Sequence, residues 1–120
     1  NTNKNILFAD ERYQLIGAAF EVYNELDSEF FEPVYREALK IGYKTKIEFE
    51  AQSQLKIRCK EHFADLIAHK EILIELKAIE KLPKREESQV LNYLKASNLR
   101  LGLLINFGHD QKLEWKRIIK

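Results

Sequence analysis

The chain has 120 residues, of which 45% are apolar and 32% charged, with a formal net charge of +1. This length supports one domain with a real core, so we predict a single domain over residues 1–120. The near-neutral charge excludes a protein that binds nucleic acid through overall charge alone. Any contact with phosphate has to come from local basic clusters or from a bound metal.

The single cysteine, Cys59, cannot form an internal disulfide and is expected to be a small buried apolar residue. Residues 1–10 hold no apolar run of the kind found in signal peptides, and no stretch approaches membrane-spanning length. We therefore expect a cytoplasmic protein without membrane contact. The histidines all fall at predicted turns and are expected at the surface: His62, His69 and His109.

Two helices are predicted in the first third of the chain. Apolar residues recur at helical spacing over residues 11–26, and Asp27 and Ser28 end this helix. Glu32 and Pro33 begin the second helix, because proline is tolerated in a first turn, where its missing N–H has no helical partner. The predicted buried stripe of this second helix consists of Val34, Tyr35, Ala38, Leu39 and Ile41.

After Lys46 the apolar period changes from helical to two, which is typical of half-buried strands. The first two strands, residues 47–51 and 55–59, are predicted to form a hairpin around residues 52–54. The later elements are strands at 63–68 and 72–77, a helix at 86–97, and strands at 101–107 and 113–119.

The predicted order is therefore two helices, four strands, a helix and two strands, which indicates an α/β fold. Residues 101–107 are almost purely apolar, as in a strand buried on both faces. The long crossover through the third helix favours a parallel pairing of this strand with an earlier one. The sequence thus predicts a mixed central sheet flanked by helices.

The most informative segment is residues 63–77. Side chains alternate along a strand, so Glu75 and Lys77 are expected on one face. A three-residue turn at residues 69–71 would pair Asp65 with Glu75. A two-residue turn would shift the register by one and send the two carboxylates to opposite faces. The sequence leaves both registers open.

Two neighbouring carboxylates repel each other unless a positive charge lies between them. Asp65, Glu75 and a strand carbonyl would offer the hard oxygen ligands that Mg²⁺ prefers. Lys77 would point toward the same ion, where it could hold or help deprotonate an attacking water or stabilise charge on a phosphate. The alternative is that Glu75 and Lys77 are the alternating charges of an ordinary solvated strand face.

Five segments, in the same order along the chain, carry a family resemblance: residues 30–35, 63–65, 74–78, 89–95 and 102–108. Together they resemble the PD-(D/E)XK nuclease superfamily and, more closely, its GxxExxY proteins. The resemblance implies a restriction-endonuclease-like core. The chain departs from the pattern at Glu29, where the group has glycine, and at Ala64, where the superfamily has proline.

The resemblance also implies roles for particular residues. Asp65 and Glu75 would be metal ligands, with Mg²⁺ as the expected cofactor and Mn²⁺ as the alternative, and Lys77 would be the catalytic lysine. Glu32 would be a further acidic residue of the site, acting through water, although the altered turn at Glu29 affects its placement. Gln89 would reach toward the metal or the substrate.

Basic residues gather after this segment at Lys81, Lys84 and Arg85, where they could contact a phosphate backbone, although such clusters are also common on solvated surfaces. Tyr93, one helical turn after Gln89, and Trp115 are candidates for stacking on a base. For Trp115, however, covering a sheet face or forming a dimer contact is the favoured interpretation.

The predicted function is a Mg²⁺-dependent nuclease that hydrolyses phosphodiester bonds in DNA and, like many nucleases of this size, acts as a homodimer. The alternative is a nuclease-fold module without activity that binds nucleic acid or a protein partner. A structural partner in a larger assembly is a third hypothesis, which predicts an exposed apolar patch and no metal affinity.

Overall fold

The computed structural model describes residues 8–44, 49–51, 54–57 and 60–120. The first elements are α1 (Ala9–Leu26), α2 (Glu32–Tyr43), β1 (Phe49–Ala51), β2 (Gln54–Ile57) and β3 (Lys60–Phe63). They are followed by β4 (Leu66–Ala68), β5 (Ile72–Lys77), α3 (Lys84–Ser97), β6 (Leu101–Asn106) and β7 (Glu114–Ile119). The α/β class is confirmed, but five strands rather than four precede α3. No described helix is long and apolar enough to cross a membrane.

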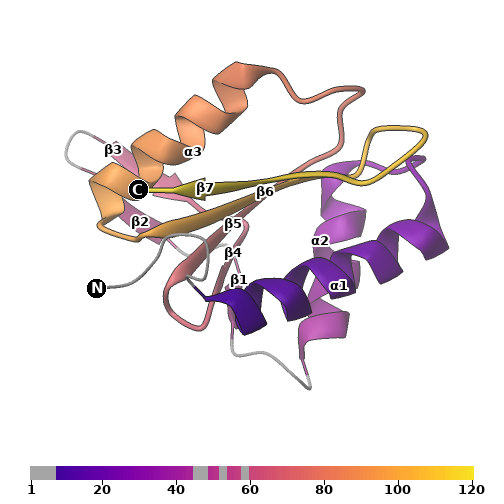
Figure 1. Cartoon of the computed structure of the whole chain (residues 1–120), viewed down its shortest axis with the longest axis horizontal. Coiled ribbons are helices and arrows are strands. Elements are labelled where there is room, and N and C mark those ends of the chain that lie inside the picture. Colours follow the sequence, from indigo (N-terminus) through magenta and orange to yellow (C-terminus); the bar gives the residue numbers. More distant parts are fainter. Residues whose placement is uncertain (1–7, 45–48, 52–53, 58–59) are drawn as a thin grey trace.

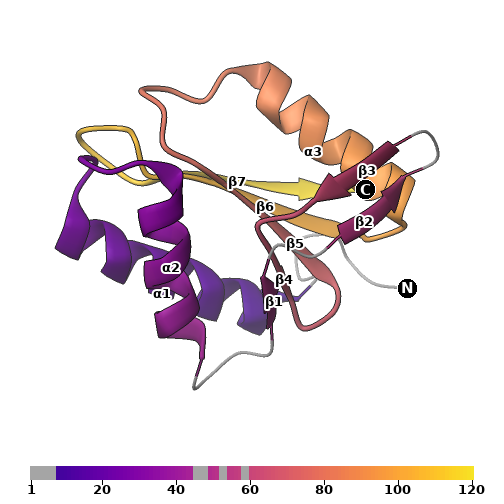
Figure 2. The ribbon, with the colours of Figure 1, turned by 180° about the vertical axis from the view of Figure 1, so that it is seen from behind.

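Five strands form the main sheet in the order β1-β4-β5-β6-β7. β5 and β6 run parallel, joined by the crossover through α3, and the other neighbours are antiparallel. The predicted mixed sheet and its parallel pair are therefore confirmed. β2 and β3 form a separate two-stranded sheet, which lies beside α3 in Figure 2.

Helices cover both faces of the main sheet, with α1 and α2 on one side and α3 on the other (Figure 1). Alternate residues of β5 divide between the two cores. Ile72, Ile74 and Leu76 join the larger core under α1 and α2, whereas Leu73 joins the smaller core under α3. Every residue of β6 is buried, so the prediction of a strand covered on both faces is confirmed.

The short strands pair differently from the prediction. β1 pairs with β4, with Phe49 opposite Ala68, and β2 pairs with β3. The predicted hairpin around residues 52–54 is therefore wrong, as is the single strand over residues 63–68, because the chain leaves β3 after Phe63 and bends at Asp65 before β4. A period of two identifies a strand but not its partner. Cys59 and the side chain of His62 lie outside the described residues.

The buried face of α2 also differs from the prediction. Tyr35, Leu39 and Tyr43 are fully buried at a spacing of four residues, whereas Val34 and Ile41 are 41% and 75% exposed. Residues four apart share one helix face, while adjacent residues point about 100° apart. The large aromatic side chains thus determine which face meets the sheet, and the placement of Val34 and Ile41 in the core was wrong.

Candidate active site

The turn between β4 and β5 sets the register on which the predicted acidic pair depends. Ala68 lies opposite Ile72, so residues 69–71 form a three-residue turn, as one of the two open registers required. The same register, continued one residue past β4, brings Asp65 level with Glu75. A hydrogen bond from the backbone of Asp65 to Glu75 agrees with this arrangement.

The Asp65 carboxylate is held from two directions. Its Oδ1 accepts a hydrogen bond from Arg36 Nε at 2.9 Å and lies 2.9 Å from Arg36 Nη2. Its Oδ2 accepts the backbone N–H of Leu76 at 2.8 Å. Helix α2 and strand β5 therefore fix the position of this carboxylate together.

Glu75 is a buried acid, with 8% of its surface exposed. Burial and, to a lesser extent, the charge of Asp65 together raise the pKa of Glu75 to about 8, against the opposing effects of Lys77 and of the Asp65 backbone. A carboxyl in this position disfavours its own charge unless a cation compensates it. Carboxyl groups with pKa values shifted in this way are frequent at functional sites.

Lys77 forms an ion pair with a residue of α3, since its Nζ lies 3.2 Å from Glu86 Oε1 and both side chains are largely buried. Burial lowers the pKa of Lys77, but the hydrogen bond and charge of Glu86 outweigh it, and Glu32 and Glu75 add to the effect. The net pKa is raised, so Lys77 keeps its proton at neutral pH.

Glu32, at the first turn of α2, belongs to the same cluster of charges. Burial raises its pKa, Lys77 opposes this shift, and the charge of Asp65 adds to it. The side chain is therefore close enough to both groups to interact with them electrostatically. We refer to Glu32, Arg36, Asp65, Glu75, Lys77 and Glu86 as the charged cluster.

Two predicted residues of α3 have different surroundings. Tyr93 is half-buried, and its pKa is raised by burial and then by the charge of Glu75. Gln89, one turn earlier, is exposed. The predicted phosphate-contacting residues are all exposed around the start of α3: Lys81, Lys84 and Arg85. Trp115, in contrast, lines an apolar groove beside Tyr13 and Phe20 of α1.

Sequence reasoning missed two members of the charged cluster, Arg36 and Glu86. Both could have been found from helical spacing, which places residues three, four and seven apart on one face. Arg36 follows Glu32 by four residues. Glu86 precedes Gln89 by three and Tyr93 by seven. The charge signs also match, because Arg36 is opposite in charge to Asp65 and Glu86 is opposite in charge to Lys77.

The donor set fits a divalent cation. Asp65 and Glu75 supply hard carboxylate oxygens, and the repulsion between them, which raises the pKa of Glu75, would be relieved by a cation. Among the described residues, no group of three or more His, Cys, Asp or Glu side chains is arranged to hold a metal. A cation would therefore complete its shell with water and backbone carbonyls, as Mg²⁺ often does.

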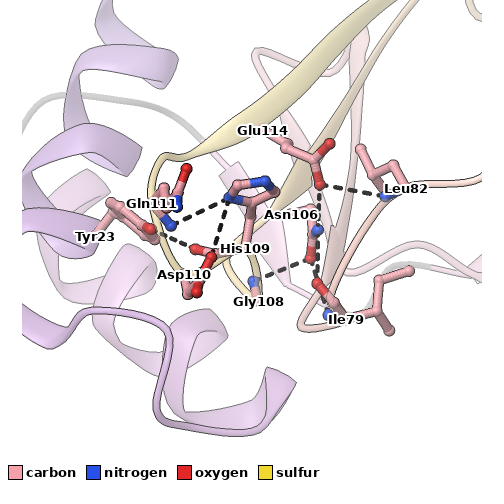
Figure 3. A network of polar contacts seen from close by, with 9 residues as sticks. All are labelled: Tyr23, Ile79, Leu82, Asn106, Gly108, His109, Asp110, Gln111 and Glu114. Atoms are coloured by element: carbon pink, nitrogen blue, oxygen red, sulfur yellow. Dashed lines mark hydrogen bonds and ion pairs between the residues drawn. The ribbon is translucent and has the colours of Figure 1, made fainter.

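A second polar network is centred on Asn106, which lies opposite Lys77 in the sheet, and it holds the segment that follows Lys77 (Figure 3). Fully buried Asn106 accepts hydrogen bonds from the N–H groups of Ile79 at 2.9 Å and Gly108 at 3.0 Å. It donates to Ile79 O and to Glu114, each at 2.8 Å. Because Glu114 also accepts the N–H of Leu82 at 3.2 Å, this Asn106 network holds the loop that leads into α3.

The histidines in the described region are less exposed than predicted. His69 and His109 lie in turns, as expected, but both are partly buried. His109 takes part in a polar contact with α1, because its carbonyl oxygen accepts the hydroxyl of Tyr23 (Figure 3). Its Nδ1 accepts the N–H of Gln111 at 3.1 Å. These contacts are structural and lie outside the charged cluster.

The mixed sheet thus carries Glu75 and Lys77 on β5, with Asp65 in the bend just before β4. A family model of the PD-(D/E)XK nuclease superfamily matches residues 9–118, and the chain belongs to this superfamily. A search of curated proteins found no match.

Two solved structures are similar in fold. The first is that of SSO0001, with a TM-score of 0.56 and 20% identity over 73% of this chain and 49% of that chain. The second is an alkaline exonuclease, LHK-Exo, from Laribacter hongkongensis, with a TM-score of 0.55 and 13% identity over 73% of this chain and 54% of that chain. The chain thus matches about half the length of each.

Proposed function

We propose that this protein is a divalent-metal-dependent nuclease that hydrolyses phosphodiester bonds in DNA. The observation that carries the proposal is the electrostatic coupling of Asp65, Glu75 and Lys77 around one end of β5. Membership in the nuclease superfamily and the similarity in fold to an alkaline exonuclease support it. A solvated strand face, the alternative interpretation, does not account for the burial of Glu75.

In this proposal Asp65 and Glu75 hold Mg²⁺, or Mn²⁺ in its place. When bound, the cation supplies Lewis-acid activation of water and of the phosphate group. Arg36 keeps the Asp65 carboxylate oriented through the contacts at 2.9 Å. Glu32 lies within electrostatic reach of Lys77 and Asp65 and acts through water.

Lys77 is the catalytic lysine of the proposed mechanism. Its ammonium group orients the attacking water and stabilises the negative charge that develops on the phosphate. Glu86 holds this ammonium group from α3 at 3.2 Å. Gln89, exposed on the same helix, orients the substrate.

Residues around α3 would bind the substrate backbone. Three exposed basic residues lie in the loop that follows Lys77 and at the start of α3: Lys81, Lys84 and Arg85. Their positive charges would attract the phosphates of the backbone. Tyr93 is half-buried within electrostatic reach of Glu75 and Lys77, where its ring would contact the substrate.

The proposal is tested by cleavage of supercoiled plasmid and short single-stranded DNA with Mg²⁺ or Mn²⁺. We expect wild-type protein to cut, chelator to stop the reaction, and Lys77→Ala and Glu75→Gln to lose activity by about 100-fold or more. Matched controls lie in the turn before β5, where Lys70→Ala and Glu71→Gln alter exposed residues of the same charge types. If Lys77→Ala and Glu75→Gln still cut DNA, the assignment of Lys77 and Glu75 as site residues would be wrong.

A second candidate function, an inactive module that binds nucleic acid or protein, is favoured by one observation. Both Asp65 oxygens already have partners, Arg36 and the Leu76 N–H, as in a site where an arginine has replaced the cation. Calorimetry with Mg²⁺ separates the two candidates. Heat of binding that is lost in Asp65→Asn favours the nuclease. No heat and no cutting favour the module or a structural partner.

The remaining expectations are proposals of the same kind. We place residues 1–120 in a single domain of the GxxExxY group, on the strength of the five sequence segments. We also expect a cytoplasmic homodimer, since a dimer would extend the modest basic surface around Lys84. Sedimentation velocity of the purified protein measures the oligomeric state directly.

A further inference from the structure

Phe31 is placed where neither helix stability nor core packing explains it. It is the N-cap residue of α2, and no side chain of the described residues caps this helix. Ser, Thr, Asp and Asn are preferred at this position because their side-chain oxygen accepts a first-turn N–H. The Phe31 side chain is 84% exposed, so it is not part of the core either. The exposed ring is therefore a candidate for contact with a binding partner at the protein surface.

The backbone that presents Phe31 is held firmly. Phe30 packs edge-on against Tyr35, with ring centroids 6.2 Å apart, and Tyr35 stacks on Phe107 at 4.5 Å. The Tyr35 hydroxyl accepts the N–H of Phe30 at 3.2 Å and donates to the carbonyl of Asp27. Because this column of rings is anchored on fully buried Tyr35 and Phe107, the Phe31 ring projects from an ordered segment. Little conformational entropy is then lost when a ligand packs on it.

Phe31 is also adjacent in sequence to a member of the charged cluster. The next residue is Glu32, which interacts electrostatically with Lys77 and Asp65, and adjacent Cα atoms are about 3.8 Å apart. The start of α2 and the loop from β5 to α3 lie toward the same end of the sheet in Figures 1 and 2. That loop and the first turn of α3 carry exposed Lys81 and Lys84.

An exposed apolar ring at the same end of the sheet as exposed cations offers partners for both parts of a nucleotide. Phosphate suits the cations, and the face of a base suits the ring, because base–aromatic stacking is favourable for every base. The faces of bases inside an intact duplex are covered by their stacked neighbours. Only an unpaired base can offer its face to Phe31.

We infer that Phe31 is a stacking platform for an unpaired nucleobase next to the phosphate at the charged cluster, so that single-stranded DNA is the preferred substrate. The inference rests on the proposed function for the position of the phosphate. It names a specificity-determining residue and a substrate structure, neither of which follows from nuclease chemistry at Asp65, Glu75 and Lys77.

The first test is equilibrium binding by fluorescence anisotropy, in chelator so that no strand is cut. Phe31→Ala is expected to weaken binding of a single-stranded oligonucleotide by about 5- to 100-fold, the range for loss of one base–aromatic stack. Binding of a blunt duplex of the same length should change by less than about twofold, and Phe31→Tyr should restore single-strand binding. Tyr13→Ala on α1 is the matched control, since that ring is 83% exposed.

The second test locates the contact on the oligonucleotide. A 2-aminopurine base moved along the strand should be quenched at one position by wild-type protein and not by Phe31→Ala, because stacking quenches its emission. An abasic site at that position should make wild-type and Phe31→Ala protein bind equally. A structural role for Phe31 would not respond to the base, and the thermal unfolding of both proteins provides a check that they are folded.

The outcomes separate this inference from the proposed function. Equal losses for single-stranded and duplex DNA, or no loss at all in Phe31→Ala, overturn the stacking platform. Self-association that depends on Phe31, with no oligonucleotide bound, overturns it as well and favours a protein contact. Binding that depends on Phe31, without cleavage, would support the stacking platform and refute the nuclease activity. Cleavage that does not depend on Phe31 would support the nuclease activity and refute the stacking platform.

Discussion

Two buried polar side chains of the described residues, Asn106 and Glu75, lie on adjacent parallel strands and have opposite energetic roles. Asn106 on β6 is a neutral amide whose partners are mostly backbone groups at 2.8–3.0 Å. Glu75 on β5 is a carboxyl whose pKa is raised by burial and by a second carboxylate. The polar atoms of the Asn106 side chain all have hydrogen-bond partners, whereas the carboxylate of Glu75 is repelled by that of Asp65.

The difference shows how the sheet divides stability and function. A buried polar network contributes to stability when its members are satisfied, and it lowers stability when a charge remains uncompensated. The Asn106 network stabilises the loop that follows Lys77. In the charged cluster, the carboxylates of Asp65 and Glu75 lie close enough to repel each other, which lowers stability. Changes at the two positions should therefore affect stability in opposite directions.

The largest effect is expected where the Asn106 network meets the backbone. A Cβ at Gly108 would lie 2.3 Å from both the N and the O of Ile79, so Gly108→Ala has to displace the chain. We expect a loss of about 3 kcal/mol or more in the free energy of unfolding, measured in urea. Gly17→Ala in α1 is the control. No neighbouring atom lies within 4 Å there, so the change should stabilise the helix by about 0.5–1 kcal/mol.

Asn106→Ala tests the same network without a steric clash. It removes the partner of three backbone groups, two of Ile79 and one of Gly108, and should lower the free energy of unfolding by about 2–3 kcal/mol. Glu114→Gln keeps the oxygen that accepts from Asn106 and Leu82, and is expected within about 0.5 kcal/mol of wild type. A neutral Asn106→Ala would mean that the loop does not depend on the network.

Glu75→Gln should act in the opposite direction. The folded pKa of Glu75, about 8, lies above its unfolded value, so stability is full at low pH and is lost as pH rises toward and through 8. In metal-free buffer the variant should match wild type near pH 4 and exceed it by roughly 2 kcal/mol at pH 9. This value is below the full linkage maximum because local rearrangement softens a buried charge. The measurement is thermal or urea unfolding across the pH series. If the variant were less stable than wild type at pH 9, the charged form of Glu75 would not be destabilising in the folded protein.

The smallest effect is that of the cation itself. A tenfold excess of Mg²⁺ over its dissociation constant should stabilise wild-type protein by about 1.4 kcal/mol, and chelator should reverse the shift in Tm. Asp65→Asn and Glu75→Gln should show no shift. Glu114→Gln, which alters a carboxylate of the neighbouring network, should keep it. Equal shifts in all four proteins would indicate binding away from the charged cluster.

The sequence by itself determined the elements whose signal is local. Helical spacing predicted α1 and the start of α2 at Glu32, and the apolar run over residues 101–107 predicted a central strand covered on both sides. Alternation placed Glu75 and Lys77 on one face of β5. A turn of either two or three residues before β5 was possible, so two registers remained open for Asp65.

Only the tertiary structure decided which of these parts meet. It selected the three-residue turn, paired β1 with β4 in place of β2, and turned Val34 and Ile41 of α2 away from the core. It brought Arg36 to Asp65, 29 residues away, and Glu86 to Lys77. Periodicity depends on a residue and its near neighbours, so it identifies a face. Which residue packs against that face depends on contacts between elements that are distant in sequence. No local pattern of a single sequence indicates those contacts.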